Sequence, residues 1–335
     1  MTAATAVAGT NIALVKYWGK RDETLNLPAT GSLSLTLDRL GTRTRVAFDG
    51  GDGARDRVTL DGAPAADKVA ARVTTFLDRV RARVGIAARA SVVTDNSVPT
   101  ASGLASSASG FAALAVAATG AAGLALTPTE LSVLARLGSG SAARSIFGGF
   151  VEMARGARAD GSDAAAHPLD AGDGWDAGAS WNIRLVVAIT SAEEKALGST
   201  AAMRRTAETS PYYEAWVSGV EGDLAAARAA IAGRDLAALG TVAERSAMRM
   251  HASAMAADPP ILYWNPATIA AISRVRALRA EGASAFFTID AGPHVKVLCD
   301  AREAEAVAAA LAETPGVLRT LIAAPGPGAR LEEAR

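Results

Sequence analysis

The sequence predicts an α+β protein of two domains. Its 335 residues exceed the ~150 that one domain usually takes, and half of them are hydrophobic, which is enough for two packed cores. Strands with alternating apolar and polar residues dominate the beginning, whereas amphipathic helices fill residues 201–281 and two apolar strands follow them. A Gly-, Ala- and Asp-rich stretch at 154–180 separates these halves. We therefore expect domains at residues 1–180 and 181–330.

Composition and charge exclude several classes of protein. Lys and Arg total 34, as do Asp and Glu, which argues against a broadly basic nucleic-acid binder. The single cysteine, Cys299, cannot form an internal disulfide, which fits a reducing cytoplasm. The apolar portion at 111–126 is shorter than the ~20 residues that a membrane span needs, so we expect a buried helix there. The first fifteen residues hold no Lys or Arg, so we expect no secretory signal.

The first half combines alternating strands with helices. Apolar and polar residues alternate on both sides of Gly41, which predicts two strands separated by a turn at that glycine. Apolar residues recur at helical spacing after the second of these strands and again after a Ser- and Gly-rich loop. The predicted strands are 10–20, 33–40, 42–48 and 90–94, and the predicted helices are 65–84, 111–126 and 129–137.

The second half is rich in helices and closes with strands. Asp290 begins the loop DAGPH, which joins the apolar strands AFFTI and VKVLC. The predicted strands are 181–190, 285–289, 295–299 and 316–323, and the predicted helices are 201–208, 212–232, 234–257, 266–281 and 302–313.

The segment PTASGLASSASG at 99–110 is the most informative junction in the sequence. Its glycines permit close approach of the backbone to a ligand, and the helix after it offers unpaired amides and a positive dipole end to an anion. Ser106 and Ser107 add hydroxyl donors. The same composition also suits a loop whose serine caps the helix, so the residues leave phosphate binding and capping both open.

A second glycine-rich segment, GSGSAARSIFGG at 138–149, places Ser139, Ser141 and Arg144 around a turn. The planar fork of an arginine suits bidentate capture of a carboxylate or phosphate, which indicates an anionic substrate. The alternative is a helix start in which the serines cap and Arg144 is solvated.

Lysines and one aspartate complete the set of candidate residues. Lys16, Tyr17 and Lys20 follow an apolar strand, so two ammonium groups can converge on one site, with solvation of Lys20 and packing of Tyr17 as the alternative. Asp290 can act as a base or bind a hydroxyl, although an aspartate in this position also supports a tight turn. Ser199 can cap a helix or bind an anion.

Five motifs in this order make the chain resemble the diphosphomevalonate decarboxylase family of the GHMP kinase superfamily over nearly its whole length. The second motif is shared across the superfamily, whereas the first and third are specific to the decarboxylases. The motifs are NIALVKYWGKRD at 11–22, PTASGLASSASG at 99–110, GSGSAARSIFGGF at 138–150, STAAMRRTAETS at 199–210 and DAGPHVKVL at 290–298.

The resemblance implies a fold and a reaction. The fold is the two-domain GHMP kinase fold, with an N-terminal domain like the second domain of ribosomal protein S5 and a ferredoxin-like C-terminal domain. In the reaction, ATP with Mg²⁺ phosphorylates the 3-hydroxyl of mevalonate 5-diphosphate, and loss of phosphate and carbon dioxide then gives isopentenyl diphosphate. The resemblance further implies a cytoplasmic homodimer, and we expect neither nucleic acid nor a membrane as its partner.

The resemblance also implies roles for the candidate residues. Asp290 would be a base or orienting group, Lys16 would stabilise charge beside it, and Arg144 would hold the substrate carboxylate. Substrate binding is expected from Tyr17, Lys20, Ser139, Ser141, Arg144 and Ser199, ATP binding from Pro99, Ser102, Gly103, Leu104, Ala105, Ser106 and Ser107, and metal binding from Ser107.

The sequence departs from the family pattern at a few positions. Gly9 stands in place of a usual proline, and His294 replaces the asparagine of DAGPN. His294 prompts the hypothesis that Asp290 is positioned differently, with reduced activity or a shifted pH dependence. Ala201 and Ala202 lie where some relatives carry a basic residue. The alternative functions are therefore a mevalonate 5-phosphate decarboxylase and a mevalonate 3-kinase without decarboxylation.

Overall fold

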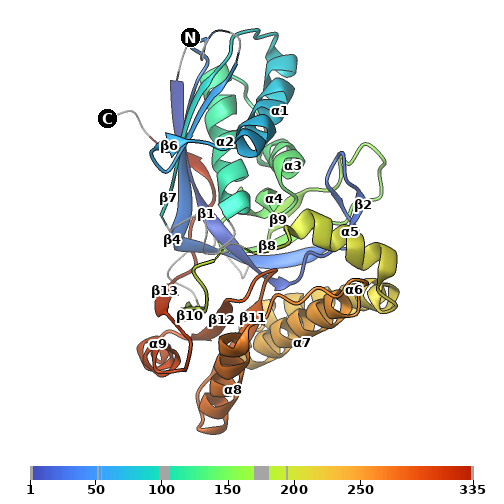
Figure 1. The fold of residues 1–335 in the computed structure, drawn as a ribbon, viewed down its shortest axis with the longest axis vertical. Helices are drawn as coiled ribbons and strands as arrows, with labels where there is room; N and C mark the ends of the chain where they lie inside the picture. Colours follow the sequence, from blue (N-terminus) through green and yellow to red (C-terminus); the bar gives the residue numbers. More distant parts are fainter. Residues whose placement is uncertain are drawn as a thin grey trace.

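The computed structural model describes residues 3–50, 53, 55–97, 106–169, 181–193 and 195–332. These residues form two large sheets with helices packed against them, which confirms the predicted α+β class (Figure 1). Within these ranges, no helix has the length and apolar character needed to cross a membrane.

The first sheet has the strand order β14-β1-β4-β7-β5-β6, with β8 paired to β4 and β9 paired to β8. Its pairs are antiparallel, except that β5 and β7 are parallel. Its strands are β1 (Ala3–Val15), β4 (Ser32–Ala47), β5 (Arg57–Leu60), β6 (Ala63–Pro64), β7 (Ser91–Asn96), β8 (Phe150–Met153), β9 (Ala166–Pro168) and β14 (Arg330–Leu331). A separate hairpin joins β2 (Lys20–Asp22) and β3 (Leu27–Pro28).

Helices cover one face of this sheet (Figure 1). They are α1 (Asp67–Val84), α2 (Ser106–Ala122), α3 (Pro128–Gly138) and the short α4 (Ala142–Ser145). The core beneath them includes Phe76 of α1, Ala113 of α2 and Val92 of β7. α2 is almost entirely buried, in agreement with the expectation of a buried helix at 111–126.

The structure corrects the turn that was expected at Gly41. β4 is one strand, not two, and it pairs with β1 on both sides of Gly41, which lies opposite Gly9. A Cβ atom on Gly41 would lie 2.5 Å from the carbonyl oxygen of Ala8. The glycine therefore permits a close approach between strands and does not turn the chain. As a result, β1 and β4 are long enough to reach from the first sheet to the second part of the molecule (Figure 1).

The second sheet is antiparallel, with the order β11-β12-β10-β13. Its strands are β10 (Ile183–Ile189), β11 (Ala285–Ile289), β12 (Val295–Asp300) and β13 (Arg319–Ala323). The helices of this half are α5 (Ser199–Thr209), α6 (Tyr213–Ala232), α7 (Leu236–Met255), α8 (Pro266–Ala280) and α9 (Ala304–Ala312). These elements lie within a few residues of the predicted ones. Elsewhere, by contrast, β1 spans Ala3–Val15 and not the predicted 10–20, and the elements β2, β3, β5, β6, β8, β9, β14 and α4 were not predicted.

A shared hydrophobic core joins the two halves. It combines Ile12 of β1 and Leu35 of β4 with Val187 of β10, Leu224 of α6 and Met250 of α7. The end of β1 is therefore fixed against the second sheet and its helices. This packing brings the residues after Val15 close to the residues after Ile289.

Candidate active site

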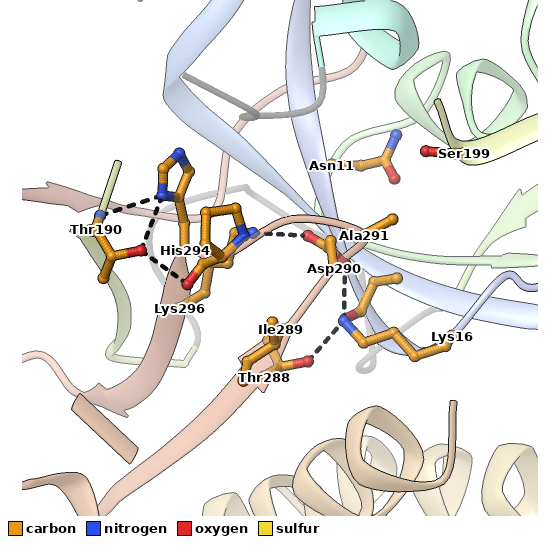
Figure 2. A network of polar contacts seen from close by, with 12 residues as sticks. Asn11, Lys16, Thr190, Ser199, Thr288, Ile289, Asp290, Ala291, His294 and Lys296 are labelled. Atoms are coloured by element: carbon orange, nitrogen blue, oxygen red, sulfur yellow. Dashed lines mark hydrogen bonds and ion pairs between the residues drawn. The ribbon is translucent and has the colours of Figure 1, made fainter. Parts of the chain in front are cut away.

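An aspartate between two buried lysines lies at the centre of the site. Lys16 follows β1, and its Nζ atom lies 2.7 Å from Oδ1 of Asp290, the first residue after β11. Lys296 extends from β12, and its Nζ atom lies 3.3 Å from Oδ2 of the same carboxylate. The side chains of Lys16 and Lys296 are 2% and 1% exposed, whereas that of Asp290 is 27% exposed. The carboxylate is therefore the member of this cluster that solvent or a substrate can reach (Figure 2).

The charges in this cluster oppose the effect of burial. Burial alone would raise the pKa of the Asp290 carboxyl, but Lys16 and Lys296 outweigh it and hold this pKa well below its usual range. Burial lowers the pKa of the Lys16 ammonium to about 8, against the opposing effect of Asp290. Asp290 is thus ionised at neutral pH, and Lys16 is a cation that loses its proton only slightly above neutrality.

Two backbone and side-chain contacts fix Lys16 at the junction of the two halves. Its Nζ donates to the carbonyl oxygen of Ala13 at 2.8 Å, and its backbone N–H donates to Oγ of Ser246 on α7 at 3.0 Å. Thr288 of β11 also donates its hydroxyl to the Ala13 carbonyl, at 3.3 Å. The position of Lys16 therefore depends on both sheets.

Arg144 is buried on α4 among neutral oxygens. Its Nη1 donates to Oγ of Ser32 at 2.6 Å, its Nε to Oγ of Ser34 at 2.9 Å and its Nη2 to Oδ1 of Asn11 at 3.0 Å. The side chain is 2% exposed, and no carboxylate of the described chain pairs with it. Burial lowers its pKa to about 10, so the guanidinium is still a cation at neutral pH. Nη1 and Nη2 each retain an N–H beyond those used here, an arrangement suited to one carboxylate.

Asn11 connects Arg144 to the loop that precedes it. Its Nδ2 donates to Oγ of Ser145 at 2.8 Å and to the carbonyl oxygen of Ser141 at 3.0 Å. The amide nitrogen of Asn11 therefore orients the α4 region, while its oxygen accepts a hydrogen bond from the Arg144 guanidinium. Asn11 begins the motif NIALVKYWGKRD, but no separate role was predicted for it.

Tyr17 lies against the loop that carries Ser139 and Ser141. A Cβ atom on Gly140 would lie 2.3 Å from the Tyr17 hydroxyl oxygen, so only a glycine admits the ring here. The Tyr17 hydroxyl is buried and bonds to no described residue. Burial raises its pKa, so it is a neutral donor. Ser139 and Ser141 lie 3.4 Å apart between their hydroxyl oxygens, which gives three hydroxyl groups in one region.

Lys20 and Ser199 lie at the start of α5 with a second lysine. Nζ of Lys20 donates to Oδ1 of Asn26 at 2.7 Å and to Oγ1 of Thr200 at 3.2 Å. Nζ of Lys195 donates to Oγ of Ser199 at 2.8 Å and lies 3.4 Å from the carbonyl oxygen of Ala291. Lys195 thereby links the first turn of α5 to the residue after the central aspartate. The two ammonium groups and the positive end of the helix dipole make this end of the site attractive to anions.

The predicted ATP-binding loop falls largely outside the described residues. This holds for Pro99, Ser102, Gly103, Leu104 and Ala105 and for the side chain of Ser106, whose backbone begins α2.

Ser107 is described, is exposed, and accepts a hydrogen bond from Ser139 at 3.5 Å between hydroxyl oxygens. The start of α2 is thus adjacent to the loop before Arg144. Among the described residues there is no group of three or more His, Cys, Asp or Glu side chains that could hold a metal ion.

His294 is turned away from the central aspartate. Its Nδ1 accepts a hydrogen bond from the backbone N–H of Thr190 at 3.2 Å, and no hydrogen bond joins it to Asp290 in the described chain (Figure 2). Burial, together with the charge of Lys296, lowers its pKa to about 3, so the imidazole is neutral near physiological pH. The structure therefore gives no support to the hypothesis that His294 shifts the pH dependence through Asp290.

Sequence reasoning missed Lys296 and Lys195. Lys296 had a visible signal, because it is a charged residue in the middle of the apolar strand VKVLC, where burial of a charge requires a partner. Lys195 lies in a polar loop and had no such signal. Ser34 was interpreted only as a polar position of the predicted strand 33–40, and Ser32 lay just outside that strand. Their contacts with Arg144 span more than a hundred residues.

The chain is similar to known proteins over nearly its whole length. Residues 8–166 match the family model of the diphosphomevalonate decarboxylase-like N-terminal domain, and residues 185–320 match that of the mevalonate 5-diphosphate decarboxylase C-terminal domain. The Aspergillus fumigatus diphosphomevalonate decarboxylase is 36% identical over 322 residues, which cover 91% of this chain and 78% of that protein.

Solved structures show the same relationship. The mevalonate diphosphate decarboxylase of Staphylococcus aureus superimposes with a TM-score of 0.92 at 36% identity, over 99% of this chain and 98% of that one. MDDEF in complex with MVAPP, AMPPCP and magnesium superimposes with a TM-score of 0.91 at 41% identity, over 99% of each chain. These matches confirm the predicted two-domain GHMP kinase fold.

Proposed function

This chain belongs to the diphosphomevalonate decarboxylase family, and we propose that its Asp290 cluster and Arg144 together carry out that family's reaction. The reaction is the ATP-dependent decarboxylation of mevalonate 5-diphosphate. It yields isopentenyl diphosphate, ADP, phosphate and carbon dioxide.

The observation that carries the proposal is the contrast between Asp290 and Arg144. Asp290 is an ionised, partly exposed carboxylate, which can accept a hydrogen bond from a substrate hydroxyl. Arg144 is a buried cation without a carboxylate partner in the described chain, which can receive the substrate's carboxylate. One substrate that carries both a hydroxyl and a carboxylate satisfies both groups.

The chemistry uses these groups in two steps. In the first, the 3-hydroxyl oxygen attacks the γ-phosphorus of ATP and ADP leaves. Asp290 orients the hydroxyl and accepts its proton, which then passes to solvent, while Lys16 offsets negative charge beside it. In the second, the bond from C3 to the phosphate oxygen breaks and phosphate leaves. The bond to the carboxylate then breaks, its electron pair forms the new double bond, and carbon dioxide departs. Arg144 holds the carboxylate in place until that point.

The residues at the start of α2 fit a nucleotide and its metal. Ser107 is an exposed hydroxyl at a helix N-terminus beside Ser139, which is the donor set that phosphate oxygens require. Magnesium, when bound, neutralises charge on the phosphates during transfer. The complex of a relative with AMPPCP and magnesium supports this assignment.

The diphosphate of the substrate is assigned to the region around the start of α5. Lys20, Lys195 and Ser199 surround the start of α5, and Tyr17 has a buried hydroxyl free of described partners. Two ammonium groups at this end favour the diphosphate over the monophosphate because the diphosphate carries more negative charge.

A coupled assay tests the reaction directly. Purified protein receives ATP, Mg²⁺ and either mevalonate 5-diphosphate or mevalonate 5-phosphate, and ADP and carbon dioxide are followed together. We expect both products, with the higher kcat/KM for the diphosphate. ADP without carbon dioxide would identify a 3-kinase, and a preference for the monophosphate would identify the other alternative.

We also propose the domain division at 1–180 and 181–330, a homodimer and a cytoplasmic location. The division agrees with the two sheets, although residues 325–331 return to the first of them. The location is supported by the single cysteine, Cys299, because a chain with one cysteine forms no internal disulfide, as is usual in a reducing compartment. Sedimentation of the purified protein at twice the chain mass would support the homodimer, and sedimentation at the chain mass would refute it.

A further inference from the structure

Lys296 occupies a costly position in the second sheet. It lies inside β12, in register with Thr288 of β11 and Val187 of β10, and its side chain is 1% exposed. A buried ammonium destabilises a fold unless an opposite charge or several acceptors compensate it. An apolar residue at this position would avoid that cost, so the lysine calls for an explanation.

The only interaction that compensates Lys296 among the described residues is with Asp290. Its Nζ forms an ion pair with Oδ2 of that carboxylate at 3.3 Å and makes no hydrogen bond within the described chain. Lys16 already binds the second oxygen, Oδ1, at 2.7 Å. The two lysines therefore approach the carboxylate from separate strands, one on each oxygen (Figure 2).

We propose that Lys296 is a positioning residue of the active site, which binds Oδ2 of Asp290 so that the carboxylate is fixed in rotation and kept ionised toward the substrate hydroxyl. The proposal rests on the proposed function, because the reaction gives the orientation of Asp290 its purpose. With both oxygens held by lysines, the carboxylate can turn neither oxygen away without breaking an ion pair.

The other charged and titratable groups around Asp290 are accounted for. Lys195, in the loop between β10 and α5, and Arg144, on α4, each interact electrostatically with the Asp290 carboxylate. Neither side chain forms a hydrogen bond or an ion pair with it among the described residues. His251 faces it from α7, and burial lowers the pKa of that imidazole to about 3, so it is neutral. Among the described residues, Lys16 and Lys296 are thus the cations in direct contact.

Removal of the Lys296 charge has a defined consequence. An adjacent opposite charge typically lowers the pKa of a carboxyl by about 1 to 3 units, so the pKa of Asp290 should rise by ~1 unit or more in Lys296→Met. Methionine has an unbranched side chain nearly as long as that of lysine, and it suits a buried position. The kcat of this variant should also fall, because the Asp290 carboxylate is no longer fixed in orientation. The affinity for ATP should stay unchanged, because Lys296 is assigned no contact with the nucleotide.

Carbon-13 NMR of protein labelled at the aspartate carboxyl carbons measures this pKa directly. The resonance missing from Asp290→Asn identifies Asp290. We expect it to titrate at higher pH in Lys296→Met than in the wild type, and the acidic limb of kcat to move in the same direction. Lys296→Arg should restore a low midpoint because it retains the charge. Lys68→Met, the same change at an exposed position on α1, should shift neither measurement.

An Asp290 midpoint in Lys296→Met that matches the wild type would overturn the proposal. If that variant does not fold, Lys296→Gln, which is uncharged but polar, takes its place with the same expectation. The NMR midpoint does not depend on turnover. A wild type that releases neither ADP nor carbon dioxide would therefore refute the proposed function and leave the Lys296 result interpretable.

Discussion

The candidate site contains two buried cationic regions, which differ in the groups that surround their charges. Lys16 and Lys296 share the carboxylate of Asp290, so their counter-charge belongs to the protein. Arg144 is surrounded by Ser32, Ser34 and Asn11, which are all neutral. The lysine region thus has part of its counter-charge within the protein, whereas Arg144 has no carboxylate partner in the described chain and under the proposed function would gain one from a bound anion.

The difference shows how the site can bind a carboxylate and then let it leave as a neutral molecule. A buried guanidinium held by hydroxyls and an amide is fixed in geometry but unsatisfied in charge. In the proposed role it would bind the substrate carboxylate strongly and would have no such interaction with carbon dioxide. The lysine region has its ion pairs already in the absence of substrate, so its geometry does not require a bound anion.

The largest expected effect comes from the carboxylate of the lysine region. Asp290→Asn should lower kcat by ~10²- to 10⁴-fold, the range typical of a lost acid–base or orienting group, and should retain ATP binding. The variant should also melt at a lower temperature, because two buried ammonium groups lose their shared counter-charge. Formation of ADP and carbon dioxide is measured at saturating ATP, and nucleotide binding is measured by calorimetry.

Asp300→Asn is the matched control for this change. Asp300 ends β12 and pairs with the exposed Arg302, so its loss should leave kcat near the wild-type value. Substantial turnover in Asp290→Asn would show that Asp290 is not the group that engages the hydroxyl.

The arginine region should show a different kinetic pattern. Arg144→Ala should lower kcat/KM for mevalonate 5-diphosphate by on the order of 10²- to 10³-fold, through a higher KM and a lower kcat, because a clamp on the carboxylate acts in both binding and reaction. The KM for ATP should not change. Steady-state kinetics with each substrate varied in turn makes the distinction.

Ser32→Ala sharpens this test, because it removes one oxygen that orients Arg144 and keeps the cation. Ser32→Ala should also raise the KM for mevalonate 5-diphosphate and lower kcat, but by less than Arg144→Ala does. An unchanged KM for the mevalonate substrate in Arg144→Ala would contradict the clamp and with it the contrast between the two regions.

The fold was largely predictable from the sequence, because strand and helix periodicities are local signals. Gly41 is the informative failure: a glycine between two alternating segments indicates a turn, but here it admits a neighbouring strand that is contributed from more than thirty residues away. The same reasoning explains why β9 was missed. Its three residues carry too little pattern to be recognised without the strand that pairs with them.

The motifs marked the residues of the candidate site more readily than the contacts among them. The proximity of Lys16 to Asp290 could be inferred from resemblance, since both belong to recognisable motifs. The contacts of the two serines with Arg144 could not be inferred, because each serine occupies an ordinary position in a strand and its partner lies about 110 residues away in the sequence. Lys296 could have been suspected from its charge within an apolar strand, but its partner is identified only by the geometry of β12 and the turn after β11.

The pH dependence should separate the two cations. The pKa of Lys16 is lowered by burial to about 8, whereas that of Arg144 is lowered to about 10. If the cationic form of Lys16 is required, kcat/KM should fall as the pH rises through about 8, because this parameter reports the free enzyme. Stability should change in the opposite direction. The folded state favours neutral Lys16, so this residue makes folding more favourable as the pH rises from about 8 toward its usual value of 10.5.

Lys16→Arg tests whether the basic limb belongs to Lys16. A guanidinium stays protonated across this range, so the fall near pH 8 should move to higher pH even though kcat is reduced. A basic limb that stays at the same pH in this variant would assign the titration to another group.

The smallest effect is expected at His294, which lies near the lysine region without belonging to it. His294→Asn should leave kcat/KM within about 2- to 3-fold of wild type, a change of less than ~1 kcal/mol, because an asparagine oxygen can accept the Thr190 N–H as Nδ1 does. The pH–rate profile should coincide with that of the wild type, since an imidazole with a pKa of about 3 carries no charge at the working pH. An acidic limb that moves in this variant would mean that His294 acts on Asp290 across the turn. The lysine region would then have three titratable neighbours, and its independence from the rest of the site would no longer hold.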